Sequence, residues 1–206
     1  MKRIRIGSHD YTLYGDYDRG YYHLLKSCEE KIIYMRARVE RDLIKPCRIA
    51  LRFADCMHVH VGLLVPTLVC SGISAASTFQ NGQEAPKGRD RAYFVGFVHR
   101  YMGAIFQDMA NDPNHPKNDT YADWLYRHVR CGLSHGFRLS WGRIEGRNLG
   151  AQILPHPASG EPQIDQHWLL EDFANGWMAY LTATSAGAGT DIADKFEARF
   201  DQLFHD

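Results

Sequence analysis

Several absences narrow what this chain does. It carries no net charge, because 24 basic residues balance 24 acidic ones, so no overall field draws it to nucleic acid or an anionic membrane. It has no Cys-x-x-Cys pair, and its five cysteines are widely spaced and odd in number. This pattern argues against a disulfide framework or a thiolate zinc knuckle. We therefore expect reduced thiols in a cytoplasmic protein.

Long hydrophobic runs are also scarce. Residues 56–83 contain no charged side chain, but Pro66 interrupts the most apolar part, and Thr67, Ser71 and Ser74 dilute it. A membrane-spanning helix needs about 20 strongly apolar residues. We expect a buried core helix here and no membrane partner.

The common cofactor motifs are missing as well. The chain has no P-loop, no Gly-x-Gly-x-x-Gly fingerprint and no His-Glu-x-x-His pair, which argues against the usual NTPase, Rossmann and zincin classes. His58 and His60 offer a weak alternative metal site, but on a helix their rings point about 160° apart. We expect no metal and no cofactor.

The composition that remains is that of one globular domain spanning residues 1–206, with 45% hydrophobic and 23% charged residues. Charge is unevenly distributed along it. Residues 1–53 hold twelve basic and seven acidic side chains, whereas residues 161–206 hold two and nine. The two ends could attract each other within one fold or across a dimer, or simply form solvated helix faces.

Hydrophobic periodicity predicts a mainly α fold, a helical bundle. Proline, glycine and capping residues set the expected boundaries. Pro46 ends the first helix or opens the next, and a kink is expected at Pro66 in the second. Asp119 or Thr120 caps the fourth. The expected helices cover residues 21–45, 48 to the seventies, 90–105, 120–133, 165–183 and 191–204. The first twenty residues indicate a loop or short strand. Apolar and polar residues alternate in 137–144, and a second short apolar segment follows at 151–154. This pattern predicts a short β-hairpin between the fourth and fifth helices, followed by a loop over 155–162.

The sharpest chemical signal is Arg130, followed by His135 with four residues between them. Arginine is a permanent cation suited to phosphate and histidine titrates near neutral pH, so the pair could bind and cleave a phosphodiester. On an unbroken α-helix the two side chains stand about 140° apart. Both face one substrate only if the arginine reaches around the helix or the helix loosens at Gly132.

Three neighbours of this pair are candidate auxiliaries. His128 precedes His135 by seven residues and lies nearly on its face, and Ser134 and Arg127 are close in sequence. The motif is short, so an exposed arginine and a hydrogen-bonded structural histidine are the alternative interpretation.

The segment 121–137 resembles the HEPN superfamily, whose signature is an arginine followed four to six residues later by a histidine late in a core helix. Uncharacterised bacterial branches carry Arg-Cys-Gly-Leu-x-His, then a hairpin and a closing helix. This chain has Arg130-Cys-Gly-Leu-Ser-His135 with a similar pattern after it. The resemblance extends over roughly residues 20–183, including 64–69 and 93–97, but only 121–137 is specific.

The resemblance implies a helical bundle, usually a homodimer that brings two motifs together. It also implies a metal-independent endoribonuclease of toxin or defence type, with a cognate antitoxin as partner. Arg130 would then stabilise the phosphorane charge, and His135 would move the proton of a ribose 2′-OH. Active members often have a polar residue after the arginine, where this chain has Cys131. A non-catalytic module that binds a nucleotide or a protein therefore stays open as the alternative.

A second, weaker candidate is a basic stripe, whose members are spaced three and four residues apart and would bind an RNA backbone. It consists of Arg38, Arg41, Lys45, Arg48 and Arg52. Pro46 interrupts it and acidic residues lie nearby, so a solvated face with local ion pairs is the other interpretation. Aromatic pairs such as Trp124 and Tyr126 could stack on bases, but their spacing favours core packing.

Overall fold

The structure is a computed structural model, and most of the residues it describes are helical, which confirms the mainly α fold. It describes residues 2–6, 9–13, 25–57, 63–110, 120–132, 139, 141–145, 153–155, 161–187 and 189–204, with the backbone alone at 2–6, 9–13, 145, 154 and 155. The helical elements are α1 (Cys28–Val39), π-helix η2 (Glu40–Ile44), α2 (Lys45–Met57), α3 (Leu64–Asn81), α4 (Asp90–Tyr101), 3-10 helix η3 (Ala104–Gln107), α5 (Tyr121–Trp124), π-helix η4 (Leu125–Cys131), α7 (Gln166–Ala186) and α8 (Asp191–Phe204). The strands are β1 (Lys2–Ile6), β2 (His9–Leu13), β3 (Arg143–Glu145), β4 (Ile153–Pro155) and β5 (Pro162–Asp165).

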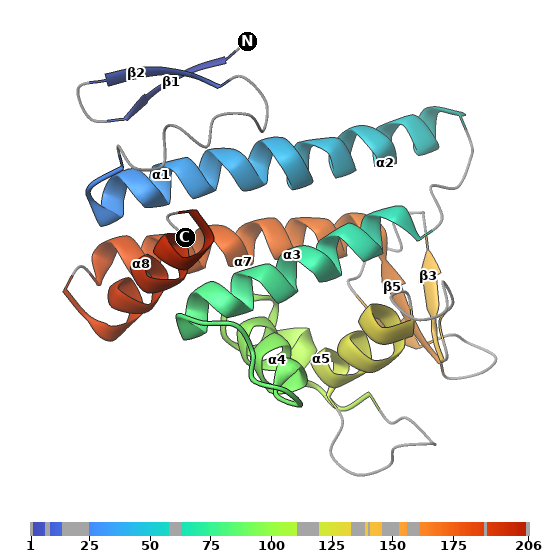
Figure 1. Ribbon diagram of the computed structural model, residues 1–206. Helices are drawn as coiled ribbons and strands as arrows, with labels where there is room; N and C mark the ends of the chain where they lie inside the picture. The colour runs from blue at the N-terminus through green and yellow to red at the C-terminus, as the bar shows by residue number, and fades with distance from the viewer. Residues whose placement is uncertain are drawn as a thin grey trace.

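The elements α1, η2 and α2 form one long rod along one side of the molecule (Figure 1). Ser27 begins it with a capping box, because its hydroxyl accepts from the Glu30 amide while the Glu30 carboxylate accepts from the Ser27 amide. The break predicted at Pro46 is wrong, whereas the alternative agrees with the structure, because Pro46 lies in the first turn of α2. The π-helical turn before Pro46 is wider than an α-turn and places Lys45 against the Glu40 carbonyl, so the proline ring fits without ending the helix.

The second expected helix is in fact two helices. Described helix α2 ends at Met57, and α3 begins at Leu64, which places Pro66 in the first turn of α3. Amides in a first turn have no partner within the helix, so the proline causes no kink there. Gly82 ends α3 in the left-handed region, with φ 75°. Among the described residues, no helix combines the length and hydropathy that a bilayer crossing requires.

The core is organised around α7, which lies between the rod on one side and α3 and α4 on the other (Figure 1). Phe173, Trp177 and Tyr180 of α7 are almost fully buried, and Phe196 and Phe200 of α8 extend the same aromatic cluster. Edge-to-face and tilted ring pairs of this kind add to the free energy gained from burial alone. The observed bounds of α7 and α8 lie within three residues of the expected ones.

The strand pairing differs from the expected hairpin. β3 and β4 are separated by β5, which pairs in parallel with β3 and antiparallel with β4. The predicted hairpin between the segments 137–144 and 151–154 is therefore wrong. The ends of the predicted loop over 155–162 lie in strands, because Pro155 belongs to β4 and Pro162 to β5, and residues 156–160 lie outside the described residues. Which strands pair depends on contacts between residues distant in sequence, and a local alternation of apolar and polar residues does not reveal these contacts. Near the N-terminus, β1 and β2 pair antiparallel, as the short-strand expectation allowed.

Candidate functional site

The helix that carries Arg130 begins at a well-defined cap. The Thr120 hydroxyl accepts from the Asp123 amide, and the Asp123 carboxylate accepts from the Thr120 amide, so the predicted cap at Thr120 is confirmed. Asp123 also forms an ion pair with Arg91 of α4 at 2.6 Å. Trp124, buried, donates its indole N–H to the Trp141 carbonyl at 3.0 Å. These bonds fix the start of the helix against α4 and against the segment that leads into β3.

From Leu125 to Cys131 the helix is a π-helix, η4. Its i→i+5 bonds change the angle between successive side chains up to Cys131, and the separation of about 140° expected between Arg130 and His135 stays a prediction. π-Helical turns are frequent at functional sites. His135 and Ser134 lie outside the described residues, and their distances to Arg130 are not part of the structure.

The Arg130 guanidinium lies over the Tyr126 ring, 5.4 Å from its centroid. It also donates weakly to the Cys131 sulfur, 3.9 Å away. Desolvation raises the pKa of Tyr126, with a further contribution from Cys131, whereas Arg130 lowers it. Stacking on an aromatic face orients an arginine without neutralising it.

Arg130 lines a cavity of about 200 Å³ between α3, α4, η4 and α8. Arg199 of α8 lines the same cavity and brings a second guanidinium to it. Hydroxyl groups from Ser74, Ser77 and Thr78 of α3 form one wall. The cavity therefore combines two permanent cations with neutral hydrogen-bonding groups.

The remaining wall comes from α4 and the loop before it. Tyr93 contributes a hydroxyl, and Glu84 and Asp90 contribute carboxylates. Both of these acidic residues are exposed. Arginine and hydroxyl groups are donors suited to oxyanions, and the carboxylates limit how strongly positive the cavity becomes.

Arg199 is the most firmly held charge of the cavity, and only 9% of its side chain is exposed. Its Nε donates to the Thr78 hydroxyl at 3.1 Å and its Nη1 to the Gln202 amide oxygen at 3.2 Å. Its Nη2 donates to the Glu84 carboxylate at 3.1 Å. Sequence reasoning missed Arg199, because it appears there as one of two basic residues in an acidic segment. Only the packing of α8 on α3 brings it to Arg130.

The two described auxiliary candidates differ in exposure. His128 is buried, with 6% of the residue exposed, and its ring makes an edge contact with Trp141 at 5.8 Å. Arg127 is half-buried. The structure does not place either of them on the wall of the Arg130 cavity. Their auxiliary roles stay predictions.

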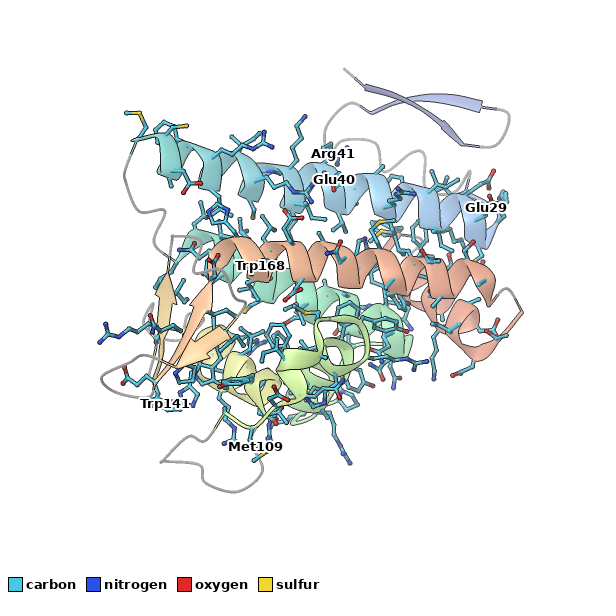
Figure 2. The ribbon with its side chains drawn as sticks, turned by 180° about the vertical axis from the view of Figure 1, so that it is seen from behind. Glu29, Glu40, Arg41, Met109, Trp141 and Trp168 are labelled. Atoms are coloured by element: carbon cyan, nitrogen blue, oxygen red, sulfur yellow. The ribbon has the colours of Figure 1, made fainter. Side chains whose placement is uncertain are left out.

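The basic stripe lies on the rod, away from the cavity. Arg48 donates to both Glu171 oxygens at 2.8 and 2.7 Å and pairs with Glu40 at 3.2 Å. Arg41 binds its neighbour Asp42. Figure 2 shows Glu40 and Arg41 on the rod, with Trp141 and Met109 on the far side of α7.

The other members of the stripe differ in their surroundings. Arg38 donates to the Tyr34 hydroxyl at 3.2 Å, whereas Lys45 and Arg52 are exposed. The basic N-terminal region and the acidic C-terminal region form ion pairs with each other within one chain. Arg48 pairs with Glu171, and Lys31 pairs with Glu197 and Asp201.

The cysteines bear on the expectation of reduced thiols, whereas the expectation of no metal stays a prediction. All five cysteines are free, and burial raises the pKa of the Cys70 thiol to about 12 and that of Cys47 to about 11. His58 and His60 lie outside the described residues. Elsewhere in the described part of the chain, no group of three His, Cys, Asp or Glu residues could hold a metal ion.

One further pattern around Arg130 was overlooked in the sequence. Gly132-Leu-Ser134-His-Gly136 matches Gly-x-Ser-x-Gly, the nucleophile turn of α/β-hydrolases. That turn follows a β-strand, whereas here the π-helix η4 runs to Cys131, directly before the pattern. The hydrolase context is therefore not met.

No protein-family model, curated protein or solved structure matches this chain. The chemistry of the cavity is what remains for assigning a function. Two guanidinium groups and several hydroxyls surround a space large enough for a phosphate group, and Arg130, the arginine of the sequence motif, is one of the two.

Proposed function

We propose that this protein is a HEPN-like, metal-independent endoribonuclease that cleaves RNA with Arg130 and His135. The observation that supports it is the position of Arg130 on the wall of a cavity shared with Arg199 and hydroxyl groups. Arginine keeps its charge at every physiological pH and binds phosphate oxygens through several N–H groups.

In the proposed reaction the ribose 2′-oxygen attacks the adjacent phosphorus, and the bond from phosphorus to the 5′-oxygen breaks. The 2′-OH proton is removed and the leaving 5′-oxygen gains a proton, so the products are a 2′,3′-cyclic phosphate and a 5′-hydroxyl end. His135 moves these protons as general base and acid. Arg130 stabilises the negative charge that grows on the phosphorane oxygens.

RNA cleavage in the presence of EDTA tests this proposal. We expect the wild type to leave 2′,3′-cyclic phosphate ends, and His135→Ala and Arg130→Ala each to lower the rate at least about 100-fold, as for loss of a group that acts in the transition state. Arg100→Ala is a matched control, because Arg100 lies over the Tyr101 ring at 5.5 Å, much as Arg130 lies over Tyr126. Equal cleavage by all variants, or cleavage that EDTA abolishes, contradicts the proposal.

The alternative is a non-catalytic HEPN-like module that binds a nucleotide or a protein. It is favoured by Cys131, which stands where active members often have a polar residue and lies 3.9 Å from the Arg130 guanidinium. Thiols are poor hydrogen-bonding groups. Absence of cleavage together with nucleotide binding that requires Arg130 would establish this alternative.

The proposal includes a setting and partners. Five free thiols fit the reducing cytoplasm. A homodimer follows from the HEPN resemblance, and a cognate antitoxin follows from the toxin assignment. Light scattering of the purified protein tests the dimer, and a molar mass equal to one chain would remove it from the proposal.

A further inference from the structure

We infer that the cavity between Arg130 and Arg199 binds a phosphate monoester, and that Glu84 occupies the anion position while the ligand is absent. The inference rests on the proposed function in so far as Arg130 belongs to both. It adds a ligand class and an internal competitor, neither of which is needed for Arg130 and His135 to cleave RNA.

The first step of the argument is the environment of Arg199. A buried cation is costly unless it is paired and hydrogen-bonded. Two of the three bonds that hold Arg199 go to neutral oxygens, on Thr78 and Gln202. The third goes to Glu84, whose side chain is 79% exposed. The buried guanidinium is thus compensated by a carboxylate that lies mostly in water.

The second step is the direction of these bonds. Thr78 holds Nε and Gln202 holds Nη1, so the orientation of the guanidinium does not depend on Glu84. The carboxylate uses Nη2, and Glu84 and Arg199 both line the cavity. If Glu84 turns away, Nη2 stays in place as a donor to another anion. An ion pair with so exposed a partner is weak, so displacement is easy.

The third step is the size and charge of the space. Pockets for drug-sized ligands measure roughly 300–1,000 Å³, whereas this cavity measures about 200 Å³. It suits one phosphate and the group attached to it, as at the end of an RNA chain or in a nucleotide. A monoester carries a charge between about −1.5 and −2 at neutral pH. With Glu84 displaced, such a group faces a wall formed by Arg130, Arg199 and the hydroxyl-bearing residues Ser74 and Tyr93.

Calorimetric titration of the full chain in phosphate-free, low-chloride buffer tests the inference. The probes are inorganic phosphate, a nucleoside 5′-monophosphate, the nucleoside without phosphate, and short RNA with a 5′-phosphate or a 5′-hydroxyl end. We expect every phosphomonoester to bind and the nucleoside not to bind. Tighter binding of the nucleotide, or of the 5′-phosphorylated RNA, identifies which source of the monoester the cavity uses.

Two variants and one control sharpen the test. Glu84→Gln removes the competitor and tightens binding about threefold, the factor expected for a weak surface ion pair. Arg130→Gln loses a charge-assisted donor and weakens binding about tenfold. Glu40→Gln is the matched control, because Glu40 also pairs with an arginine, at 3.2 Å, but on the rod. It leaves the affinity unchanged. Thermal unfolding without ligand verifies that each variant is folded.

Some results would overturn the inference. These are no phosphate-dependent binding by either the wild type or Glu84→Gln, or an affinity that Glu84→Gln leaves unchanged or weakens. Equal affinity for RNA with 5′-phosphate and 5′-hydroxyl ends overturns it only if the nucleotide also binds no more tightly than the nucleoside. The His135→Ala variant separates this inference from the proposed function. Binding without any cleavage overturns the ribonuclease alone, whereas cleavage without monoester binding overturns the monoester site alone.

Discussion

The basic stripe on the rod and the cavity around Arg130 and Arg199 both concentrate arginines, but they surround them differently. On the rod, half-buried Arg48 lies between the carboxylates of exposed Glu40 and half-buried Glu171. In the cavity, Arg199 is held by neutral oxygens and a single exposed carboxylate. The comparison teaches that the number of basic residues in a segment does not locate an anion site. An anion site is located better by how deeply an arginine is buried and by how little of its charge nearby carboxylates already neutralise.

The largest expected difference between the two regions concerns RNA. The Arg41→Gln, Lys45→Gln and Arg52→Gln triple variant should weaken RNA binding chiefly at low salt and lower the salt slope of log K by about 2, because each single-strand phosphate contact contributes about 0.7. Its maximal cleavage rate should stay within about threefold of wild type, against about 100-fold for Arg130→Ala. Cleavage assays across a salt series measure both quantities. A triple variant as inactive as Arg130→Ala would reverse the comparison.

A smaller difference between the cavity and the rod is expected in how much an arginine contributes to the free energy of unfolding. Arg199→Ala removes a buried side chain with hydrogen bonds to Thr78 and Gln202, and we expect a loss of about 2 kcal/mol in the free energy of unfolding. Arg48→Ala breaks surface ion pairs and should cost less than about 1 kcal/mol. Urea denaturation at pH 7 gives both values. Equal losses would mean that burial does not distinguish the two arginines.

The smallest expected effect is a pH dependence on the rod. The hydrogen bond from Arg48 lowers the pKa of Glu171, although burial acts in the opposite direction. A lowered folded-state pKa contributes stability above the unfolded value of about 4.3, and this is lost as pH falls through the folded-state pKa. Because more than a third of each side chain of the pair is exposed, solvent screening should keep the contribution below about 1 kcal/mol.

Glu171→Gln provides the measurement. Urea denaturation at pH 7 and pH 3 should show a smaller loss of stability on acidification for Glu171→Gln than for wild type. An identical loss in the two proteins would show that Arg48 and Glu171 do not interact in solution.

The elements that the sequence predicted well are those with local signals. Thr120 and Asp123 form their capping box within four residues, and the starts of α4 and α8 follow loops rich in Gly, Pro or Ser. Where the outcome depended on distant contacts, the prediction failed. β5 was not predicted, because its partners, β3 and β4, lie elsewhere in the chain. Pro46 was taken for a stop because a π-helical turn has no simple sequence signal.

In the candidate site, too, the residue with a local sequence signal was predicted and the residues that depend on distant contacts were not. Arg130 was found because a short motif names it. Arg199 was not, because its role depends on α8 packing against α3, and no periodicity or spacing links it to Arg130. Glu84 was likewise invisible as a partner, since it reaches Arg199 from a loop 115 positions earlier in the chain.

The position of Arg199 also bears on the order in which the protein is made. Its hydrogen bond to Thr78 joins residues 121 positions apart. Synthesis proceeds from the N-terminus at about 5–20 residues per second, so α3, α4 and η4 leave the ribosome before α8 exists. The α8 wall of the cavity forms only when α8 docks on α3, so a nascent chain cannot hold phosphate between Arg130 and Arg199 before α8 has been synthesised.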